Sequence, residues 1–536
     1  MASFMRRFAP WSRDNQEYQS LPLTNDGVPA VEDVKEVDSA AAEPRFKWLQ
    51  ATKPSSQWFW ALMPFIIAGP LGKTDRTLPK TTSTTYLNGV RGLACWVVFN
   101  HHMTMDIYRP WIFKPYGLGP PGENEYFFQL PIVRILHTGK GMVCLFFALS
   151  GFVLSYSSLR KINNSDCHSE KLGDELLTGL SSALLRRGIR LFSPMLVLAL
   201  ITAIVTYYMP WGDMDHEAPS IFFNLLKFYR ACVKVMNPYS WETAKLPKHF
   251  PHAWTLAQEY RLSLALFLML IATCKLTPLA RKSAIAVVGV WSMYCDRRWD
   301  VLGFMGGFLI AELRFVPLCQ DLSGLFRRRS LELNRWVYMV AGGIAVVIGL
   351  LFCSWPENPG VKNVQPYKSF FQLVPMSWRG KTETELSNSY IWYFGSIGAI
   401  LTLWGMEQLP LLQHALSSTA LNYLGEISYA FYLVHWLFRQ FVGEPLFHRF
   451  VKDLKFSRTS SFFAAYTITL VLVVLVSDYF WRAIDEKCVK LARFIVTDIL
   501  GVGAKRTKRF ETPPMQQTAE RTCTPDGEEV PVLRLD

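Results

Sequence analysis

The sequence predicts an all-α fold, a polytopic transmembrane helical bundle of about ten spans with a short interfacial helix before the first span. Half of the 536 residues are hydrophobic and only 18% are charged, whereas a soluble protein has about a quarter. The charges are also unevenly distributed. Several runs of about 18 to 22 residues are nearly free of charge, which is the length that an α-helix needs to cross a bilayer.

The composition divides the chain into four segments. Residues 1–55 form a polar cytoplasmic tail that we expect to be partly disordered, and residues 56–83 hold an interfacial segment and a linker. The apolar run from Trp58 to Gly69 is too short to span a bilayer. Residues 84–485 form the transmembrane domain, and residues 486–536 form a cytoplasmic tail, first basic and then mixed in charge. No signal peptide is evident, so the first span is expected to act as its own signal anchor.

Ten apolar runs predict the spans. The fifth and sixth are short and are interrupted by Asp296-Arg297-Arg298, which predicts a helical hairpin. The runs cover residues 86–104, 140–158, 189–209, 255–274, 283–295, 300–314, 336–353, 390–405, 420–440 and 461–481.

The basic residues between the spans predict the orientation. The connections 159–190 and 315–335 are rich in Arg and Lys, which places them and both termini in the cytoplasm. The connection 441–460 does not fit this orientation, because it is basic but falls on the outer side. The sequon at Asn163 falls on the cytoplasmic side, so it should stay unmodified. We expect a multi-pass protein of an endomembrane, the ER or Golgi.

The net charge of +13 does not indicate nucleic acid, because the basic residues lie next to spans, where they meet anionic lipid or a phosphorylated cofactor. The 10 cysteines lack metal or disulfide spacing. We therefore expect membrane lipids as partners, no metal and no nucleic acid.

The first span carries polar residues that are costly in a membrane and are therefore functional candidates. Arg91 and His102 are 11 positions apart, about three helical turns, so they share one face and are separated by roughly 16 Å along the axis. Cys95 falls on the same face, whereas His101 points about 100° away from His102.

Two polar clusters follow from the orientation. Arg186, Arg187 and Arg190 match the depth of Arg91 at the inner end, and clustered guanidinium groups suit phosphate. Glu259 in the fourth span is at a depth comparable with His102. A neutral imidazole can take a proton from an alcohol, and a nearby carboxylate can orient it.

Each of these residues also has a plainer interpretation. The three arginines can be positive-inside anchors, and His102 can be a hydrogen-bonded core residue. His101 is the alternative working imidazole, since the helix phase is uncertain near an end. Glu259 can simply neutralise Arg261. For Cys95 we favour packing over a thioester role.

Two further spans carry polar patches. Small residues at Ser150-Gly151 allow close helix packing or leave room for a slender ligand, which makes Ser150 a candidate cofactor contact. In the ninth span Tyr432 and His435 are three residues apart and lie on one face.

At these residues the sequence resembles the acyltransferase 3 family of integral membrane acyl-CoA-dependent O-acyltransferases, over roughly residues 84–485. The family's Leu-Asp-Gly-Leu-Arg-Gly, with a histidine 11 positions after the arginine, is similar to the segment from Leu87 to Gly92 and His102. Four further segments resemble family motifs in the same order: Phe146 to Phe152, Arg186 to Pro194, Trp254 to Glu259, and Ile427 to Trp436.

The resemblance implies an acyl-CoA donor, with Arg91 and His102 essential for transfer, and a fungal-type member that acylates a carbohydrate, lipid or secondary metabolite. The chain departs from the pattern at Asn88, where the family has aspartate, and at Tyr260 and Arg261, where a second acid and glutamine are usual.

We therefore predict an O-acyltransferase in which acyl-CoA, expected to be acetyl-CoA, rests its phosphates on Arg91, Arg186, Arg187 and Arg190. His102 is the expected general base and Glu259 orients it. The alternatives are a multispan transporter that uses intramembrane Arg, His and Glu, and a family member that has lost catalysis. The acceptor, the acyl chain length and the oligomeric state stay open.

Overall fold

The computed structural model describes residues 63–69, 71, 81–164, 170–209, 219–239, 251–318, 335–378, 383–502, 521–523 and 529–531. The tail predicted for residues 1–55, the first part of the interfacial segment and most of the C-terminal tail lie outside these residues. The regular secondary structure of the described part is helical apart from two short strands. β1 (Arg521–Cys523) and β2 (Glu529–Pro531) pair antiparallel, with Thr522 opposite Val530.

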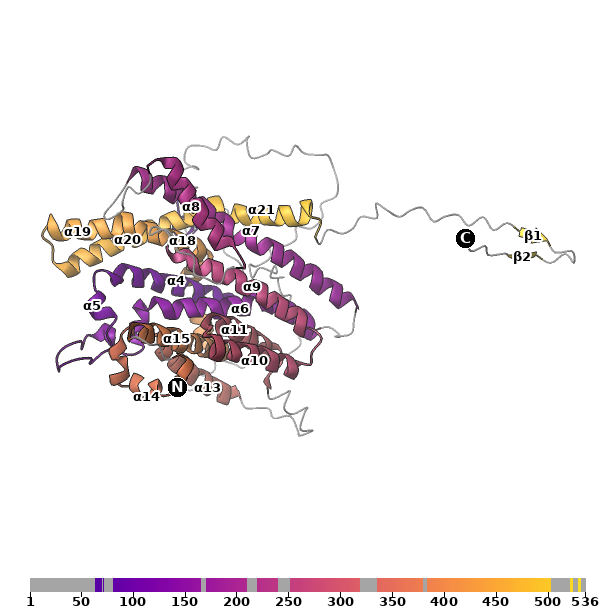
Figure 1. Cartoon of the computed structure of the whole chain (residues 1–536), viewed down its shortest axis with the longest axis horizontal. Helices are drawn as coiled ribbons and strands as arrows, with labels where there is room; N and C mark the ends of the chain where they lie inside the picture. The colour runs from indigo at the N-terminus through magenta and orange to yellow at the C-terminus, as the bar shows by residue number, and fades with distance from the viewer. Residues whose placement is uncertain are drawn as a thin grey trace.

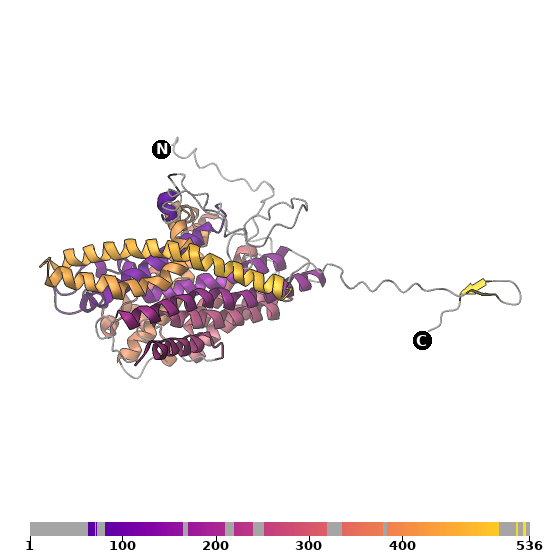
Figure 2. The same ribbon diagram turned by 90° about the horizontal axis from the view of Figure 1, so that it is seen from above.

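Long helices run side by side in one bundle (Figures 1 and 2). Eight of them coincide with predicted spans, because each contains all or nearly all of one of the apolar runs. They are α4 (Thr85–Met105), α6 (Gly139–Asn164), α9 (Trp254–Thr273), α10 (Pro278–Asp296), α11 (Trp299–Phe315), α13 (Arg335–Cys353), α15 (Glu383–Gln408) and α20 (Arg458–Phe480).

The predicted hairpin between the fifth and sixth spans is confirmed as α10 and α11. Arg297 lies between them in the left-handed conformation, with φ of 54°, and its backbone N–H caps the end of α10 by donating to Ser292. Arg298 then pairs with Asp300 at 2.6 Å in the first turn of α11.

The third predicted span is longer than its apolar run. Helix α7 (Glu170–Tyr208) has 39 residues and begins well before residue 189. Most of the predicted connection 159–190 is therefore helical, since α6 also continues to Asn164. As a consequence Arg186, Arg187 and Arg190 lie inside a helix rather than in a loop.

The ninth predicted span is divided into consecutive helical pieces. α16 (Pro410–Leu416) leads into α17 (Thr419–Glu426) and α18 (Ser428–Phe438), and a π-helical turn η8 (Arg439–Gly443) joins α18 to α19 (Glu444–Lys452). The basic connection predicted at 441–460 is thus helical as far as Lys452. α20 begins at Arg458.

Shorter elements lie in the connections between the long helices and after α20. The connections contain α5 (Arg109–Ile112), η3 (Phe127–Gln129), η4 (Val133–His137), α8 (Ile221–Met236), η5 (Pro251–Ala253), η6 (Pro359–Asn363), α14 (Tyr367–Phe371) and η7 (Met376–Trp378). After α20 the chain continues through η9 (Trp481–Asp485), α21 (Glu486–Phe494) and η10 (Ile495–Ile499).

Five helical segments of the described chain are long and apolar enough to cross a membrane. They are Gly139–Asn164, Leu172–Tyr208, Pro251–Thr273, Arg335–Cys353 and Arg458–Ile499. The other predicted spans do not meet this standard of length and composition: α11 has only 17 residues, and α4 contains Arg91, Asn100 and two histidines. The molecule is a helical membrane protein by these segments, and the count of ten is not established by them.

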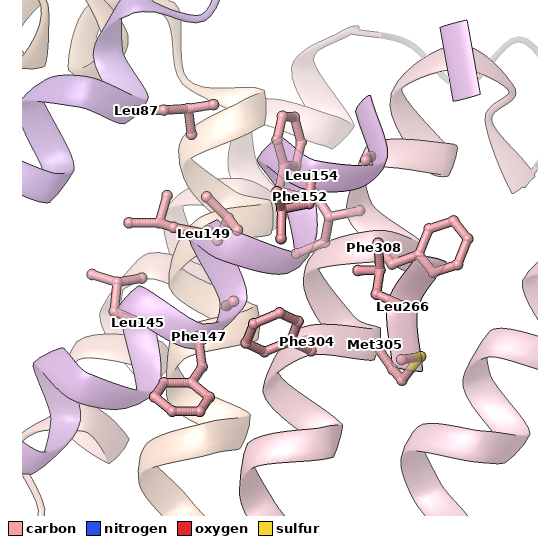
Figure 3. Packing of buried hydrophobic residues seen from close by; sticks show 14 of the residues in the cluster. Leu87, Leu145, Phe147, Leu149, Phe152, Leu154, Leu266, Phe304, Met305 and Phe308 are labelled. Carbon is pink, nitrogen blue, oxygen red and sulfur yellow. The ribbon is translucent and has the colours of Figure 1, made fainter. Parts of the chain in front are cut away.

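The main hydrophobic core surrounds α6 (Figure 3). Phe147 and Phe152 of this helix face Phe304 and Phe308 of α11. Gly151 and Gly307 let the two helices approach until their backbones touch, because a Cβ on Gly307 would lie 1.9 Å from the carbonyl oxygen of Ala148. Close packing of this kind replaces the hydrophobic driving force that helices lack inside a bilayer.

The segment expected to be interfacial packs partly against the bundle. Of the run from Trp58 to Gly69, the structure describes the end, where α3 (Phe65–Ala68) forms a single turn. The Phe65 ring stacks on Tyr423 with centroids 6.1 Å apart, and its backbone N–H donates to Asp478. An interfacial helix is therefore not established.

Candidate active site

The candidate site lies along the contact between α4 and the helices α17 and α18. Glycines bring α4 and α17 into backbone contact, because a Cβ on Gly92 would lie 2.6 Å from the backbone nitrogen of Gly425. Gly425 in turn lies against the carbonyl of Asn88. This packing fixes which side chains of the two helices face one another.

Arg91 lies toward the N-terminal end of α4 in this contact. Its half-buried side chain forms no direct hydrogen bond or ion pair with the described residues, but it interacts electrostatically with Arg190, Glu426, Glu259 and Asp485. A guanidinium held among other charges without a direct partner is suited to receive an anion.

Asn88 lies one turn before Arg91 and contacts a carboxylate from another helix. Its amide nitrogen donates to Glu426 Oε1 at 2.6 Å and to Asn422 Oδ1 at 2.8 Å. The acidic group expected from the resemblance at position 88 is thus supplied by α17. Sequence reasoning did not single out Glu426, although a glutamate within a predicted span is a signal that could have found it.

Glu259 belongs to the arginine cluster rather than to His102. It accepts from Arg187 Nη2 at 2.6 Å and from Ser150 Oγ at 3.1 Å, while Arg187 Nε donates to Ser263 Oγ at 3.2 Å. The described residues show no hydrogen bond between Glu259 and His102, so these contacts do not support the expectation that Glu259 orients His102. Helix α9 packs so that Glu259 contacts Arg187 of α7 and Ser150 of α6. The position of a residue along its span predicts its depth in the membrane, but it does not predict which helix lies next to it.

His102 lies near the C-terminal end of α4 among aromatic rings. Its ring is stacked at 25° on His435, with centroids 5.3 Å apart, and meets Trp436 edge-on at 4.8 Å. Its Nδ1 faces Met105 Sδ at 3.4 Å. A thioether is a weak acceptor, so this contact favours a proton on Nδ1 and leaves Nε2 as the basic nitrogen.

His101 has different surroundings, although it is adjacent. Its Nδ1 donates to the carbonyl of His137 at 3.0 Å, because a carbonyl oxygen can only accept. The buried ring also fills the space beside Gly139, where a Cβ would approach it to 2.7 Å. His101 thus joins α4 to the start of α6.

Tyr432 and His435 connect α18 to the start of α9. The Tyr432 hydroxyl donates to the carbonyl of His252 at 2.5 Å and also contacts Thr255 Oγ1 at 2.6 Å. The His252 and His435 rings lie 5.2 Å apart. His102, His435 and His252 therefore form a line of imidazoles, of which the sequence had indicated only the first two.

Arg439 holds the end of α4. Its Nε donates to the carbonyl of His102 at 2.8 Å, and its guanidinium forms an ion pair with Asp106. The same group lies over the Trp436 ring, 4.8 Å from its centroid. Sequence reasoning missed this residue, because it falls at the boundary of the predicted ninth span.

The predicted face of α4 is visible in these contacts. Arg91 interacts with Glu426 at the end of α17, Cys95 Sγ donates to the carbonyl of Ser428, and His102 stacks on His435. All three side chains thus face the same neighbouring segment. The arrangement joins a guanidinium near the N-terminal end of α4 to an imidazole near its C-terminal end.

Fold and site define a class: a multi-helix membrane protein with an internal line of arginine, carboxylate and histidine side chains. The profile of the Acyltransferase domain family (Acyl_transf_3) matches residues 84–482, and the chain belongs to this acyltransferase family.

Three curated fungal proteins are similar over most of their length. The O-acetyltransferase PaAT-1 of Phomopsis amygdali is 26% identical over an alignment of 454 residues that covers 78% of this chain and 85% of that protein. Acyltransferase clz18 of Cochliobolus lunatus is 24% identical over 466 residues, 76% of this chain and 95% of that protein. Acyltransferase R4 of a Phoma species is 25% identical over 489 residues, 77% and 97% of the two chains. No solved structure matches the chain.

Proposed function

We propose that the protein transfers an acyl group, specifically acetyl, from acyl-CoA to a hydroxyl of a carbohydrate, lipid or secondary metabolite. The observation that carries the proposal is the placement of Arg91 and His102 on one side of α4, against a single neighbouring segment. The name of the O-acetyltransferase relative supports acetyl as the group transferred.

The phosphates of the coenzyme rest at the inner end of the bundle. Arg91 has no direct partner among the described residues, and Arg190 lies within electrostatic reach. Arg186 and Arg187 belong to the same helix as Arg190. Glu259 and Ser150 act here by fixing Arg187, rather than by serving the base. The pantetheine arm then covers the roughly 16 Å to His102.

His102 acts as general base, with His101 in a structural role. As the acceptor oxygen attacks the thioester carbonyl, its proton passes to His102 Nε2. The carbon–sulfur bond then breaks, and the imidazolium returns the proton to the leaving thiolate, which gives free coenzyme A. Arg439 supports this step by holding the backbone of His102. Proximity of the two substrates supplies much of the acceleration.

The topology follows from the charges between spans. Ten spans, with both termini in the cytoplasm of an ER or Golgi membrane, put the arginine cluster on the cytoplasmic side, where acyl-CoA is made available.

The test measures acyl transfer from labelled acetyl-CoA in membranes that contain the protein, with free coenzyme A as the second product. His102→Ala should lower turnover at least about a hundredfold, because a positioned general base contributes that much. His101→Asn is the matched control, since an asparagine amide can still donate to the His137 carbonyl, and this variant should retain most activity. An active His102→Ala protein would remove the base assignment.

A further inference from the structure

Two buried polar atoms of rings that contact His102, and a third that follows them in the chain, lack hydrogen-bond partners among the described residues. They are His435 Nε2, Trp436 Nε1 and Gln440 Oε1. All three belong to α18 and the π-helical turn η8 that follows it, and η8 packs against α4. Buried polar atoms are nearly always satisfied in native proteins, so two of them in rings against the same histidine indicate that another molecule completes them. π-helical turns inside helices are also frequent at functional sites.

The tautomer of His435 is fixed by its surroundings. Its Nδ1 lies 2.6 Å from the carbonyl oxygen of Tyr432, which can only accept, so Nδ1 carries the proton. In the neutral ring Nε2 is then a hydrogen-bond acceptor. The residue is 1% exposed, so bulk water does not reach this nitrogen freely.

Trp436 provides the complementary group. Its ring is held between His102 and the Arg439 guanidinium, each 4.8 Å from it. An indole nitrogen can only donate, so Trp436 Nε1 needs an acceptor. The hydrogen-bond acceptor of His435 and the hydrogen-bond donor of Trp436 thus come from consecutive residues, and both rings contact the ring of His102.

We propose that His435 and Trp436 form the binding subsite for the acyl acceptor and select one that carries a second hydroxyl next to the reacting one. A hydroxyl can donate to His435 Nε2 and accept from Trp436 Nε1 at the same time, whereas a hydrocarbon leaves both atoms unsatisfied. The substrate class is therefore a diol or polyol rather than a simple alcohol. This inference rests on the proposed function, because it requires His102 to face the acceptor.

The experiment compares two probes, trans-cyclohexane-1,2-diol and cyclohexanol, as acceptors of labelled acetyl-CoA with the full-length protein in membranes. The readout is the ratio of kcat/KM for the diol to that for the alcohol, which cancels any loss of folded protein. The wild type should favour the diol at least about tenfold, since a site built to bind a hydroxyl rejects the analogue that lacks it.

Two substitutions then locate the selectivity. Trp436→Phe removes only the N–H of the ring, and His435→Phe removes the acceptor nitrogen, so each should lower the ratio severalfold. His435→Gln places an amide oxygen near the lost nitrogen and should restore part of the ratio. Trp404→Phe, in α15 and outside the site, is the matched control and should keep the wild-type ratio.

The outcomes separate the two proposals. A ratio near one in the wild type, or one that neither variant changes, overturns the subsite. Release of coenzyme A to water with no acetylation of either probe also overturns the subsite but leaves acyl-CoA turnover intact. If the wild type releases no coenzyme A under any condition, the proposed function fails and the subsite fails with it.

Discussion

At the scale of single residues, Asn88 and Glu426 form a matched pair. The amide of Asn88 donates to a carboxylate oxygen of Glu426 at 2.6 Å, and Arg91 interacts electrostatically with the same carboxylate. An aspartate at position 88 would place two carboxylates in contact. The neutral side chain at position 88 is therefore compatible with an acid at position 426, and one negative charge is kept beside Arg91.

This pairing predicts the result of a charge exchange. Asn88→Asp should lower the free energy of unfolding by about 2 kcal/mol, because a charge-assisted hydrogen bond becomes a repulsive contact. Glu426→Gln should weaken the binding of acetyl-CoA by removing the charge beside Arg91. The double variant should recover most of both losses, since the amide and the carboxylate have exchanged places. Thermal unfolding in detergent and the KM for acetyl-CoA measure the two effects, and simple addition of the two single effects would contradict the pairing.

His137 makes the loop before α6 sensitive to acid. Burial, and secondarily the positive charge of Arg134, lower the pKa of His137 from its ordinary value to about 4. Its Nε2 donates to the carbonyl of Phe128 at 2.9 Å, and its own carbonyl accepts from His101.

The direction in which pH changes the stability of this loop can be tested. Because the folded pKa is lower than the ordinary value of about 6.5, the neutral ring stabilises the loop fully above pH 6.5. This stability is lost as the pH falls from 6.5 toward 4, by about 2 kcal/mol at pH 5. Limited proteolysis between residues 106 and 138 should therefore accelerate on acidification. In His137→Gln, which can still donate to Phe128, the acceleration should be smaller.

At the scale of the elements, a buried ionic cluster joins the start of α10 to the ends of α11 and α6. Arg281 of α10 donates to Glu312 of α11 at 2.8 Å and to Asn163 of α6 at 2.8 Å, and Asn163 also donates to Glu312. Arg281 and Glu312 are almost completely buried. The three helices are therefore held together by a network in which each member has a partner.

Removal of one member should be costly. Glu312→Ala leaves the Arg281 charge buried without its carboxylate, so we expect a loss of about 3 kcal/mol or more in the free energy of unfolding. The exposed pair of Arg449 and Asp453 at 4.0 Å is the control. Asp453→Asn should leave the unfolding temperature unchanged, because exposed pairs contribute little. Equal effects of the two substitutions would contradict the role of burial.

The elements also show what the sequence could and could not predict. The apolar runs located α4, α9 and α20 within a few residues, because hydrophobic length is a local property. The start of α7 was misplaced, since a charged helix outside the apolar run has the same composition as a loop. The sequence pairs Glu259 with His102 because the depth of a residue in the membrane can be estimated from its position along a span. The observed pairing of Glu259 with Arg187 depends on which helices are neighbours, and the sequence does not give this.

At the scale of the whole molecule, the seam between α4 and the segment α17–α18 joins the two ends of the bundle. Arg91 and Glu426 lie at one end, and His102 with His435 lies at the other. The chemistry proposed here uses both ends, because a coenzyme held by its phosphates must extend its acyl group along this seam. The orientation of the bundle then decides from which side each substrate enters.

Glycan mapping can establish that orientation. The connection from α19 to α20, which is basic and therefore disagrees with the charge rule, carries the exposed Lys455 with φ of 56°. Asparagine tolerates this left-handed conformation, and Lys455→Asn creates a sequon with Phe456 and Ser457. In the proposed topology this site faces the lumen, so the variant should acquire one glycan that a glycosidase removes.

The natural sequon at Asn163 provides the internal control. It should remain unmodified, because it faces the cytoplasm in the proposed topology and because both polar atoms of its side chain are bonded to Arg281 and Glu312. Glu312→Ala combined with Arg281→Ala frees the side chain and separates these two reasons. A glycan on Asn163 in this double variant, together with none at position 455, would show that the bundle is inverted. The arginine cluster would then face the lumen, where acyl-CoA could not reach it directly from the cytoplasm.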